Sequence, residues 1–205
     1  MALTYPIGFD VDRLRTAIRT MYGELAHDPS ANVHFHCGPD YAVERLGYDP
    51  DDLAELPVGA TAAFAGVGNP FRLGAIGPGE TVLDIGCGTG TDLLIAARRV
   101  GRGGRAIGID MTAAMRDKAR EHARSMALRE RVDVRPGFAE DLPVNDASVD
   151  VVQSNGVLNL TTDKMRAFGE ILRVLKPGGR LHLADVALHA DLKEHERLDP
   201  SLWAG

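Results

Sequence analysis

Apolar residues recur at helical spacing near the start of the chain. Between residues 9 and 27 the apolar positions follow one another at intervals of three or four: Leu14, Ile18, Met21 and Leu25. This spacing predicts one amphipathic helix. Prolines then break residues 28–70 repeatedly, so that only short helices and loops fit there.

From residue 80 onward, short apolar runs alternate with helical patterns. The runs predict five strands: ETVLDI (80–85), GRAIGID (104–110), RVDVRP (131–136), ASVDVVQS (147–154) and GRLHLADV (179–186). The stretches between them predict helices: 91–100, 112–126 and 163–175. Strands that alternate with helices of this length form a parallel sheet that is covered on both faces. We therefore predict a doubly wound, mostly parallel α/β core over residues 76–205 and a helical cap over 1–75, in one compact unit.

Charge and cysteine content narrow the function classes. Asp and Glu number 29 against 23 Lys and Arg, a net charge of −6 without a basic stripe, which argues against nucleic-acid binding. The sequence shows neither an apolar run long enough for a membrane span nor a leader, so we expect a cytoplasmic protein without membrane contact. Cys37 and Cys87 lack the spacing of a zinc site, and no metal site is predicted.

The strand ETVLDI runs directly into a glycine-rich turn, GCGTGTD. Gly86, Gly88 and Gly90 stand at alternate positions, and glycine lets backbone N–H groups come close to a ligand because no Cβ intervenes. The turn opens a helix, whose free N–H groups can receive an anion. The next strand ends in Asp110, which can accept hydrogen bonds from a ribose diol. Together these features predict a nucleoside-containing ligand.

The spacing of the turn separates two kinds of cofactor. Dinucleotide-binding loops read G-x-G-x-x-G, whereas this turn reads D-x-G-x-G-x-G from Asp84 onward. Asp84 would repel a pyrophosphate but could attract the ammonium or sulfonium group of S-adenosylmethionine. An NAD-dependent oxidoreductase is therefore the weaker interpretation.

Four motifs in combination resemble the class I S-adenosylmethionine-dependent methyltransferases: VLDIGCGTGTD, GIDMT, GFAEDLP and LKPGG, within residues 75–186. The resemblance implies a Rossmann-like methyltransferase fold that binds S-adenosylmethionine. Gly86, Gly88 and Gly90 would hold the methionine and ribose portions. Asp110 would bind the ribose, and Met111 would lie on the adenine or else only pack in the core.

The resemblance also places the loop at 137–141 against the adenine edge. Phe138 stands where many members have an acid that contacts the adenine amino group. Ala139 could still offer its backbone N–H. Glu140 would lie close to the adenine or cap a turn.

A longer set of peptides resembles one branch of that family, the arsenite methyltransferases. The set includes YGELA (22–26), LGYDPDDLAELP (46–57), GNP (68–70), LPVNDASVDVVQSNGVLNL (142–160) and DPSLWAG (199–205). Thiolates suit soft trivalent arsenic, and the resemblance implies cysteines where this chain has Val67 and Gly156, with a third beyond Gly205. Only Cys37 could replace an N-terminal thiol. We therefore expect an arsenite methyltransferase-like enzyme that methylates another small molecule.

The sequence does not identify the catalytic residues, because methyl transfer needs positioning and a dry pocket more than a general base. Candidate pocket groups lie in the HFHCG stretch and after the fourth strand: His34, His36, Cys37, Asn155 and Asn159. Among them His36, Cys37 and Asn155 are the catalytic candidates, and Asn155 could also contact the cofactor. His182 lies inside a strand and is expected to be structural. The alternative function is a catalytically silent S-adenosylmethionine-binding module.

Methyltransferases of this class usually continue with two more strands after the one predicted at 179–186. The remaining residues here read as helix and loop, so the terminal strands are expected to be missing. The sheet edge would then be open or covered by a second copy in a homodimer. We also expect residues 28–70 to act as a lid over the carboxyl edge of the sheet, with HFHCG near the pocket mouth.

Overall fold

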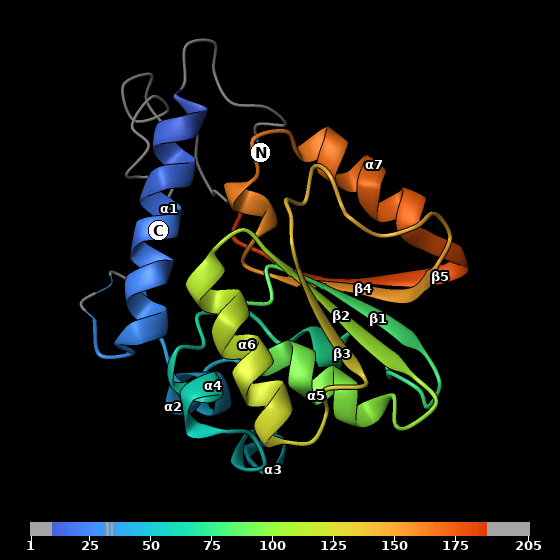
Figure 1. Cartoon of the computed structure of the whole chain (residues 1–205), viewed down its shortest axis with the longest axis horizontal. Coiled ribbons are helices and arrows are strands. Elements are labelled where there is room, and N and C mark those ends of the chain that lie inside the picture. The colour runs from blue at the N-terminus through green and yellow to red at the C-terminus, as the bar shows by residue number, and fades with distance from the viewer. Residues whose placement is uncertain (1–9, 32, 34, 188–205) are drawn as a thin grey trace.

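The structure is a computed structural model that describes residues 10–31, 33 and 35–187. Five strands form one parallel sheet in the order β3-β2-β1-β4-β5, with helices on both faces (Figure 1). The strands are β1 (Thr81–Ile85), β2 (Arg105–Asp110), β3 (Val132–Pro136), β4 (Val149–Asn155) and β5 (Leu175–Ala184). The predicted doubly wound α/β core is confirmed.

The helices form a core set and a cap set. The core set is α5 (Thr91–Arg99), α6 (Ala113–Ser125) and α7 (Lys164–Val174), with a short 3₁₀ turn η2 (Leu158–Leu160) after β4. The cap set is α1 (Val11–His27), α2 (Pro39–Glu44), α3 (Pro50–Ala54), α4 (Val58–Ala62) and the 3₁₀ turn η1 (Pro70–Arg72). The long first helix and the broken segment after it agree with the apolar and proline patterns. Asp10 begins α1 because its side chain accepts a hydrogen bond from the N–H of Arg13.

Two apolar layers enclose the sheet. One face packs against α7, through a cluster that includes Leu83, Ile85, Ile109, Val152, Ile171 and Val174. The other face packs against α5 and α6 in a second cluster. This second cluster also includes residues of the cap, among them Tyr48, Leu53, Leu56 and Phe64. The cap and the sheet therefore share a hydrophobic core, which fixes the cap relative to the strand ends.

The last strand begins at Leu175 rather than at Gly179 as predicted. Val149 pairs with Leu175 and Val151 with Arg180, so that the residues between form a bulge opposite Asp150. Lys176 Nζ donates hydrogen bonds of 2.9 and 2.8 Å to the two carboxylate oxygens of Asp150. Proline and glycine in LKPGG predict a turn, and the turn is present as this bulge within the strand.

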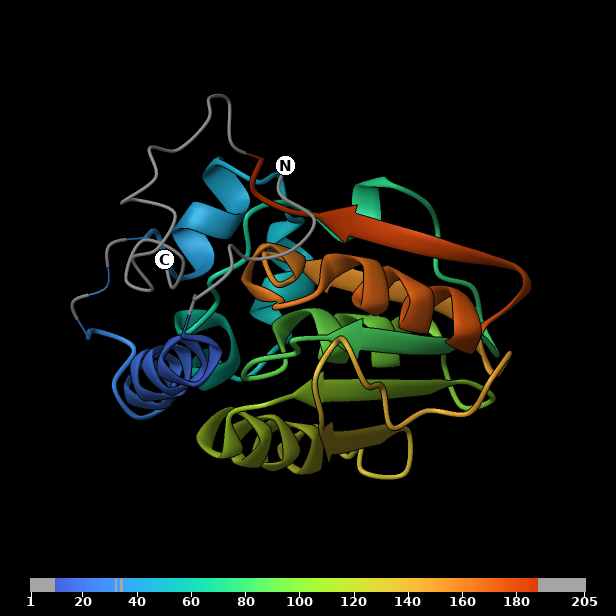
Figure 2. The same cartoon turned by 90° about the horizontal axis from the view of Figure 1, so that it is seen from above.

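The carboxyl ends of the strands all point toward the side where α1 lies (Figure 2). Within the described residues β5 is an edge strand of the sheet. The expected end of the sheet and the DPSLWAG segment involve residues after 187, which lie outside the described part. No helix in the described ranges is long and apolar enough to cross a membrane.

Candidate functional site

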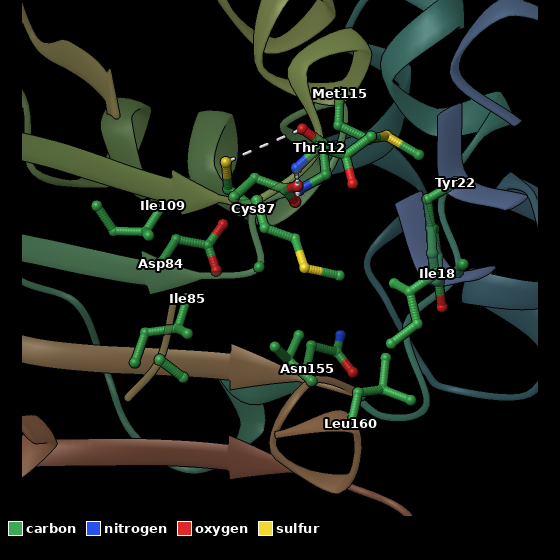
Figure 3. Close-up of a pocket in the computed structure, with 18 of the residues that line it drawn as sticks. Ile18, Tyr22, Asp84, Ile85, Cys87, Ile109, Thr112, Met115, Asn155 and Leu160 are labelled. Carbon is green, nitrogen blue, oxygen red and sulfur yellow. Dashed lines mark hydrogen bonds between the residues drawn. The ribbon is translucent and has the colours of Figure 1, made fainter. Parts of the chain in front are cut away.

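A cleft opens at the carboxyl ends of β1, β2 and β4, and the empty space in it, including the solvent-open mouth, is about 1100 Å³. Ile18 and Tyr22 of α1 face the strand ends across it (Figure 3). The cleft brings together most of the predicted cofactor residues: Asp84, Gly86, Gly88, Asp110, Met111, Ala139, Glu140 and Asn155. Gly90 is not among the lining residues and instead begins α5. The cleft thus lies at the carboxyl edge of the sheet, where the sequence predicts a ligand site.

The turn after β1 depends on glycine for two different reasons. At Gly86 a Cβ atom would lie 2.3 Å from Cγ2 of Val157, and φ is +71°. At Gly88 there is more space, but φ of +52° is left-handed, a conformation that side chains disfavour. The N–H of Gly86 donates a 2.7 Å hydrogen bond to the carbonyl of Ile109. The turn therefore lies close against β2 and presents main chain to the cleft.

Asp84 forms part of the cleft floor and is only 3% exposed. Its Oδ2 has no hydrogen-bond partner among the residues that the structure describes. Burial raises the pKa of this carboxyl group well above its usual range, and the nearby Asp92 and Asp110 raise it further. A buried carboxylate with acidic neighbours is stabilised by a cation. The floor of the cleft is therefore suited to a positively charged ligand group.

Asp110 lies at the end of β2 with its carboxylate held by main-chain donors. Oδ2 accepts a 2.9 Å hydrogen bond from the N–H of Gly88, and Oδ1 accepts one of 2.8 Å from the N–H of Thr112. Burial raises its pKa, and these hydrogen bonds oppose that rise. Each oxygen can accept a second hydrogen bond, so the carboxylate is oriented to receive a ligand diol.

Met111 follows Asp110 and lines the cleft. It also packs against the cluster of Leu14 and Ile18 on α1. Both interpretations of this residue, contact with a ligand ring and core packing, are compatible with its position.

The loop after β3 is fastened to α1 and to the segment after η2. Oε1 of Glu140 accepts hydrogen bonds of 2.7 and 2.6 Å from the N–H and hydroxyl of Thr162. Arg15 of α1 lies 3.9 Å from Oε1 of Glu140, and its guanidinium carbon lies 4.4 Å from the ring centre of Phe138. Glu140 thus anchors a loop at the wall of the cleft. The predicted position of the 137–141 loop at the site agrees with this geometry.

Asn155, at the end of β4, uses its side chain to join the cap to the core. Its Oδ1 accepts hydrogen bonds from the N–H groups of Val67 at 2.8 Å and Gly68 at 3.1 Å. Its Nδ2 donates to Oδ2 of Asp92 at 3.0 Å and to the carbonyl of Gly68 at 2.9 Å. Tyr48 donates a 2.7 Å hydrogen bond to the other oxygen of Asp92. Asn155 is therefore committed to positioning the 66–68 loop.

Sequence reasoning missed Asp92 and Tyr48. Burial raises the pKa of Asp92 to about 6, although its hydrogen bonds from Asn155 and Tyr48 oppose the rise. An acid in the first helical turn after a glycine loop was a visible signal for Asp92. Tyr48 lies 44 positions from Asp92 in the sequence, and no local pattern connects the two.

Of the HFHCG candidates that the structure describes, neither His36 nor Cys37 is among the residues that line the cleft. His36 is exposed and stacks on the ring of Tyr41, with ring centres 5.2 Å apart. Cys37 is half-buried, and it packs in a cluster with Tyr22, which does line the cleft. Burial raises the pKa of the Cys37 thiol. His34 lies outside the described residues.

Asn159 of η2 is also not among the residues that line the cleft. Its main-chain N–H donates a 3.0 Å hydrogen bond to Oδ2 of Asp185.

Gly156 lines the cleft, and Val67, which is not among the lining residues, lies beside it. A Cβ atom on Gly156 would lie 3.2 Å from Cγ1 of Val67. Cys87, in contrast, is buried in the glycine turn, and burial raises the pKa of its thiol well above its usual range. Among the described residues there is no group of three His, Cys, Asp or Glu side chains that could hold a metal ion.

Comparison with known proteins finds methyltransferases both among the curated relatives and among the solved structures. An arsenite methyltransferase from Halobacterium salinarum is 47% identical over 79% of this chain and 41% of its own length. A demethylmenaquinone methyltransferase from Symbiobacterium thermophilum is 35% identical over 50% of this chain and 41% of its own length. The crystal structure of CrArsM, an arsenic(III) S-adenosylmethionine methyltransferase from Chlamydomonas reinhardtii, has 37% identity and a TM-score of 0.67. It matches 74% of this chain and 53% of CrArsM.

The chain spans less than half the length of these curated relatives. The model of the family described as "Methyltransferase domain" matches residues 76–205, more than half of the chain. This match includes the glycine turn, Asp110 and every strand of the sheet. The predicted relationship is thereby confirmed, and the chain belongs to the methyltransferase domain family.

Proposed function

We propose that this chain binds S-adenosylmethionine and takes part in transferring its methyl group to a small molecule. The observation that carries the proposal is the buried, unpartnered Oδ2 of Asp84 beside the glycine turn. This group calls for a cationic ligand, and S-adenosylmethionine carries both an ammonium and a sulfonium group. The pyrophosphate of NAD would meet repulsion at the same place.

Different residues along the cleft would contact different parts of the cofactor. Asp84 would hold the ammonium group, and the main chain of Gly86 and Gly88 would lie against the methionine and ribose portions. Asp110, held by Gly88 and Thr112, would accept hydrogen bonds from the ribose hydroxyls. These are the charge-assisted contacts expected to dominate affinity.

The adenine would lie between β2 and the loop after β3. Met111 offers an apolar surface for the ring, and the N–H of Ala139 offers a donor for its edge. Glu140 supports this end of the cleft by holding Thr162, so that the wall is formed before the ligand arrives.

When bound, S-adenosylmethionine supplies a methyl group on a positively charged sulfur, which an in-line nucleophile displaces. This chain contributes orientation and exclusion of water to that reaction. Ile18 and Tyr22 of α1 and Leu160 of η2 form an apolar wall opposite the strand ends (Figure 3). Asn155 acts as a positioning residue here, because its polar atoms are already engaged with the 66–68 loop and Asp92.

The acceptor would be a small, largely apolar molecule. The charged groups on the α1 side of the cleft, Arg15 and Glu140, lie 3.9 Å apart and neutralise each other. Phe64, Val157 and Leu160 provide apolar surface in the same region.

The net charge of −6 gives nucleic acid no electrostatic attraction. We place the protein in the cytoplasm, with the β5 edge as the surface through which two copies could associate.

Calorimetry with S-adenosylmethionine and S-adenosylhomocysteine tests the proposal. We expect micromolar dissociation constants, about −8 kcal/mol, and weaker binding by Asp84→Asn. Asp117→Asn, on the exposed face of α6, is the matched control and should bind as the unaltered protein does. Tight NAD binding without a response to S-adenosylhomocysteine would reject the proposal. Binding without methyl transfer to any acceptor in a panel of thiols, phenols and amines would instead favour the silent module.

A further inference from the structure

A buried row of polar side chains crosses three neighbouring strands next to the cleft. Asp84 on β1 pairs in register with Gln153 on β4, and Gln153 pairs with His182 on β5. Residues paired in this way project to the same face of a parallel sheet. Their exposed fractions are 3%, 0% and 2% respectively. An acid, an amide and an imidazole thus lie side by side in the interior.

Each member of the row keeps a buried polar atom without a conventional hydrogen bond to the described part of the chain. These atoms are Oδ2 of Asp84, both amide atoms of Gln153 and Nδ1 of His182. Unpaired buried polar groups cost free energy, whereas apolar residues of similar size would pack without that cost. Only Asp84 of the three lines the cleft. The row therefore calls for an explanation that involves the cleft.

Within the described part of the chain, the charged groups that act on Asp84 are both acidic. The titratable side chains that face it are Asp92 from α5, Asp110 from β2, Tyr48 from the cap and Cys87 from the turn. Asp92 and Asp110 raise the pKa of Asp84, while the Gln153 amide lowers it by favouring the charged carboxylate. His182 is faced by Arg180 and Glu80, and burial lowers the pKa of its imidazole, which keeps the ring neutral.

We propose that Gln153 and His182 are positioning residues of the cofactor site, which hold the Asp84 carboxylate in the orientation and charge state that bind a ligand ammonium group. The inference rests on the proposed function. In the ligand-bound protein the Gln153 N–H₂ group would donate to Asp84, and its carbonyl would accept from Nδ1 of the neutral His182 ring, so that the atoms now unpaired would pair with one another. A neutral donor chain of this kind stabilises the carboxylate from behind and leaves Oδ2 free for the ligand.

The experiment measures S-adenosylhomocysteine affinity by calorimetry between pH 5.5 and 8.5. This ligand keeps the ammonium group and lacks the sulfonium, so it reports on Asp84. Gln153→Leu should weaken binding about tenfold near neutral pH, the effect of one hydrogen bond to a charged group. It should also move the midpoint of the affinity–pH curve upward, because Asp84 becomes harder to ionise. A merely structural role would leave that midpoint unchanged.

Variants of His182 provide the second part of the experiment. His182→Leu should shift the curve in the same direction, and His182→Asn should restore binding because its amide N–H can replace Nδ1. Adding His182→Leu to Gln153→Leu should cause no further loss, since the row is already broken. Leu183→Met, on the opposite face of β5, is the control, and thermal unfolding shows that each variant is folded at the assay temperature.

The outcomes separate the two proposals. If the unaltered protein does not bind S-adenosylhomocysteine, the proposed function fails and this inference fails with it. If the unaltered protein binds, but Gln153→Leu keeps both its affinity and its midpoint, only the row is rejected. Additive losses in the double variant would also reject it.

Discussion

The main-chain N–H of Gly88 donates a 2.9 Å hydrogen bond to Oδ2 of Asp110. This bond joins the turn after β1 to the end of β2, although the two residues are 22 positions apart in the sequence. The second carboxylate oxygen is fixed by Thr112 at 2.8 Å. Asp110 therefore meets its ligand already oriented, and little side-chain entropy is lost on binding.

Asp110→Ala should weaken binding of S-adenosylmethionine and S-adenosylhomocysteine alike. Removing one or two charge-assisted hydrogen bonds costs about 1.5–3 kcal/mol, or about 10- to 100-fold in affinity. Calorimetry at one pH measures the change. Asp117→Ala serves as the surface control, and equal affinities of the two variants would show that Asp110 does not contact the ribose.

Asn155→Ala should destabilise the fold, because it leaves the N–H groups of Val67 and Gly68 without their acceptor. Asp92 also loses a donor. We expect a loss of about 2–4 kcal/mol in the free energy of unfolding, measured by urea denaturation. Asn145→Ala, at an exposed position, should change it by less than about 0.5 kcal/mol. A loss no larger than this control would mean that the 66–68 loop is held by other contacts.

The sequence predicted the parts of the site that lie close together along the chain. Asp84, Gly86 and Gly88 share one turn, and the carboxyl-edge rule placed Asp110 beside them. The Tyr48–Asp92–Asn155 network was out of reach, because it depends on how the cap packs against α5.

The same limit explains the HFHCG segment. A histidine-rich stretch in a broken region indicates polar chemistry, but local pattern does not say which way it faces. Packing of Cys37 against Tyr22 and stacking of His36 on Tyr41 decide that direction.

Stability should depend on pH through Asp92. Burial raises the pKa of Asp92 from its ordinary value of 3.8 to about 6, so the folded state binds the proton more tightly than the unfolded chain does. Protonated Asp92 therefore stabilises the folded protein. This stabilisation is complete below the pKa that Asp92 has in the unfolded chain, and it is lost as the pH rises through about 6. The difference in unfolding free energy between the unaltered protein and Asp92→Asn should therefore fall by about 2 kcal/mol between pH 4 and pH 7. Urea denaturation between pH 4 and pH 7 measures it.

The exposed Asp117 provides the control for that series. Replacement of Asp117 by Asn should leave the pH dependence of the unaltered protein in place. A difference between Asp92→Asn and the unaltered protein that stays constant with pH would contradict the assignment to Asp92.

Arsenite should be a poor acceptor for this chain. Soft trivalent arsenic favours thiolate ligands, and Val67 and Gly156 stand where the arsenite branch is expected to have cysteines. They are adjacent, with Cγ1 of Val67 at 3.2 Å from a Cβ on Gly156, so thiols at these two positions would form a pair that is missing here. Cys37 is one half-buried thiol beside Tyr22, and Cys87 is buried in the glycine turn.

An assay with arsenite, excess thiol and S-adenosylmethionine should therefore yield little methylated arsenic. Val67→Cys should raise arsenite binding above this baseline, because it adds a thiol beside Gly156 of the cleft. Val58→Cys, at an exposed position that is not among the residues lining the cleft, should not. Gly156→Cys is a less suitable variant, because φ at this position is +73°. Residues with a Cβ atom disfavour this left-handed backbone conformation. Robust turnover by the unaltered chain that is abolished by Cys37→Ser, and not by Cys87→Ser, would show that a single cap thiol is enough for arsenite chemistry.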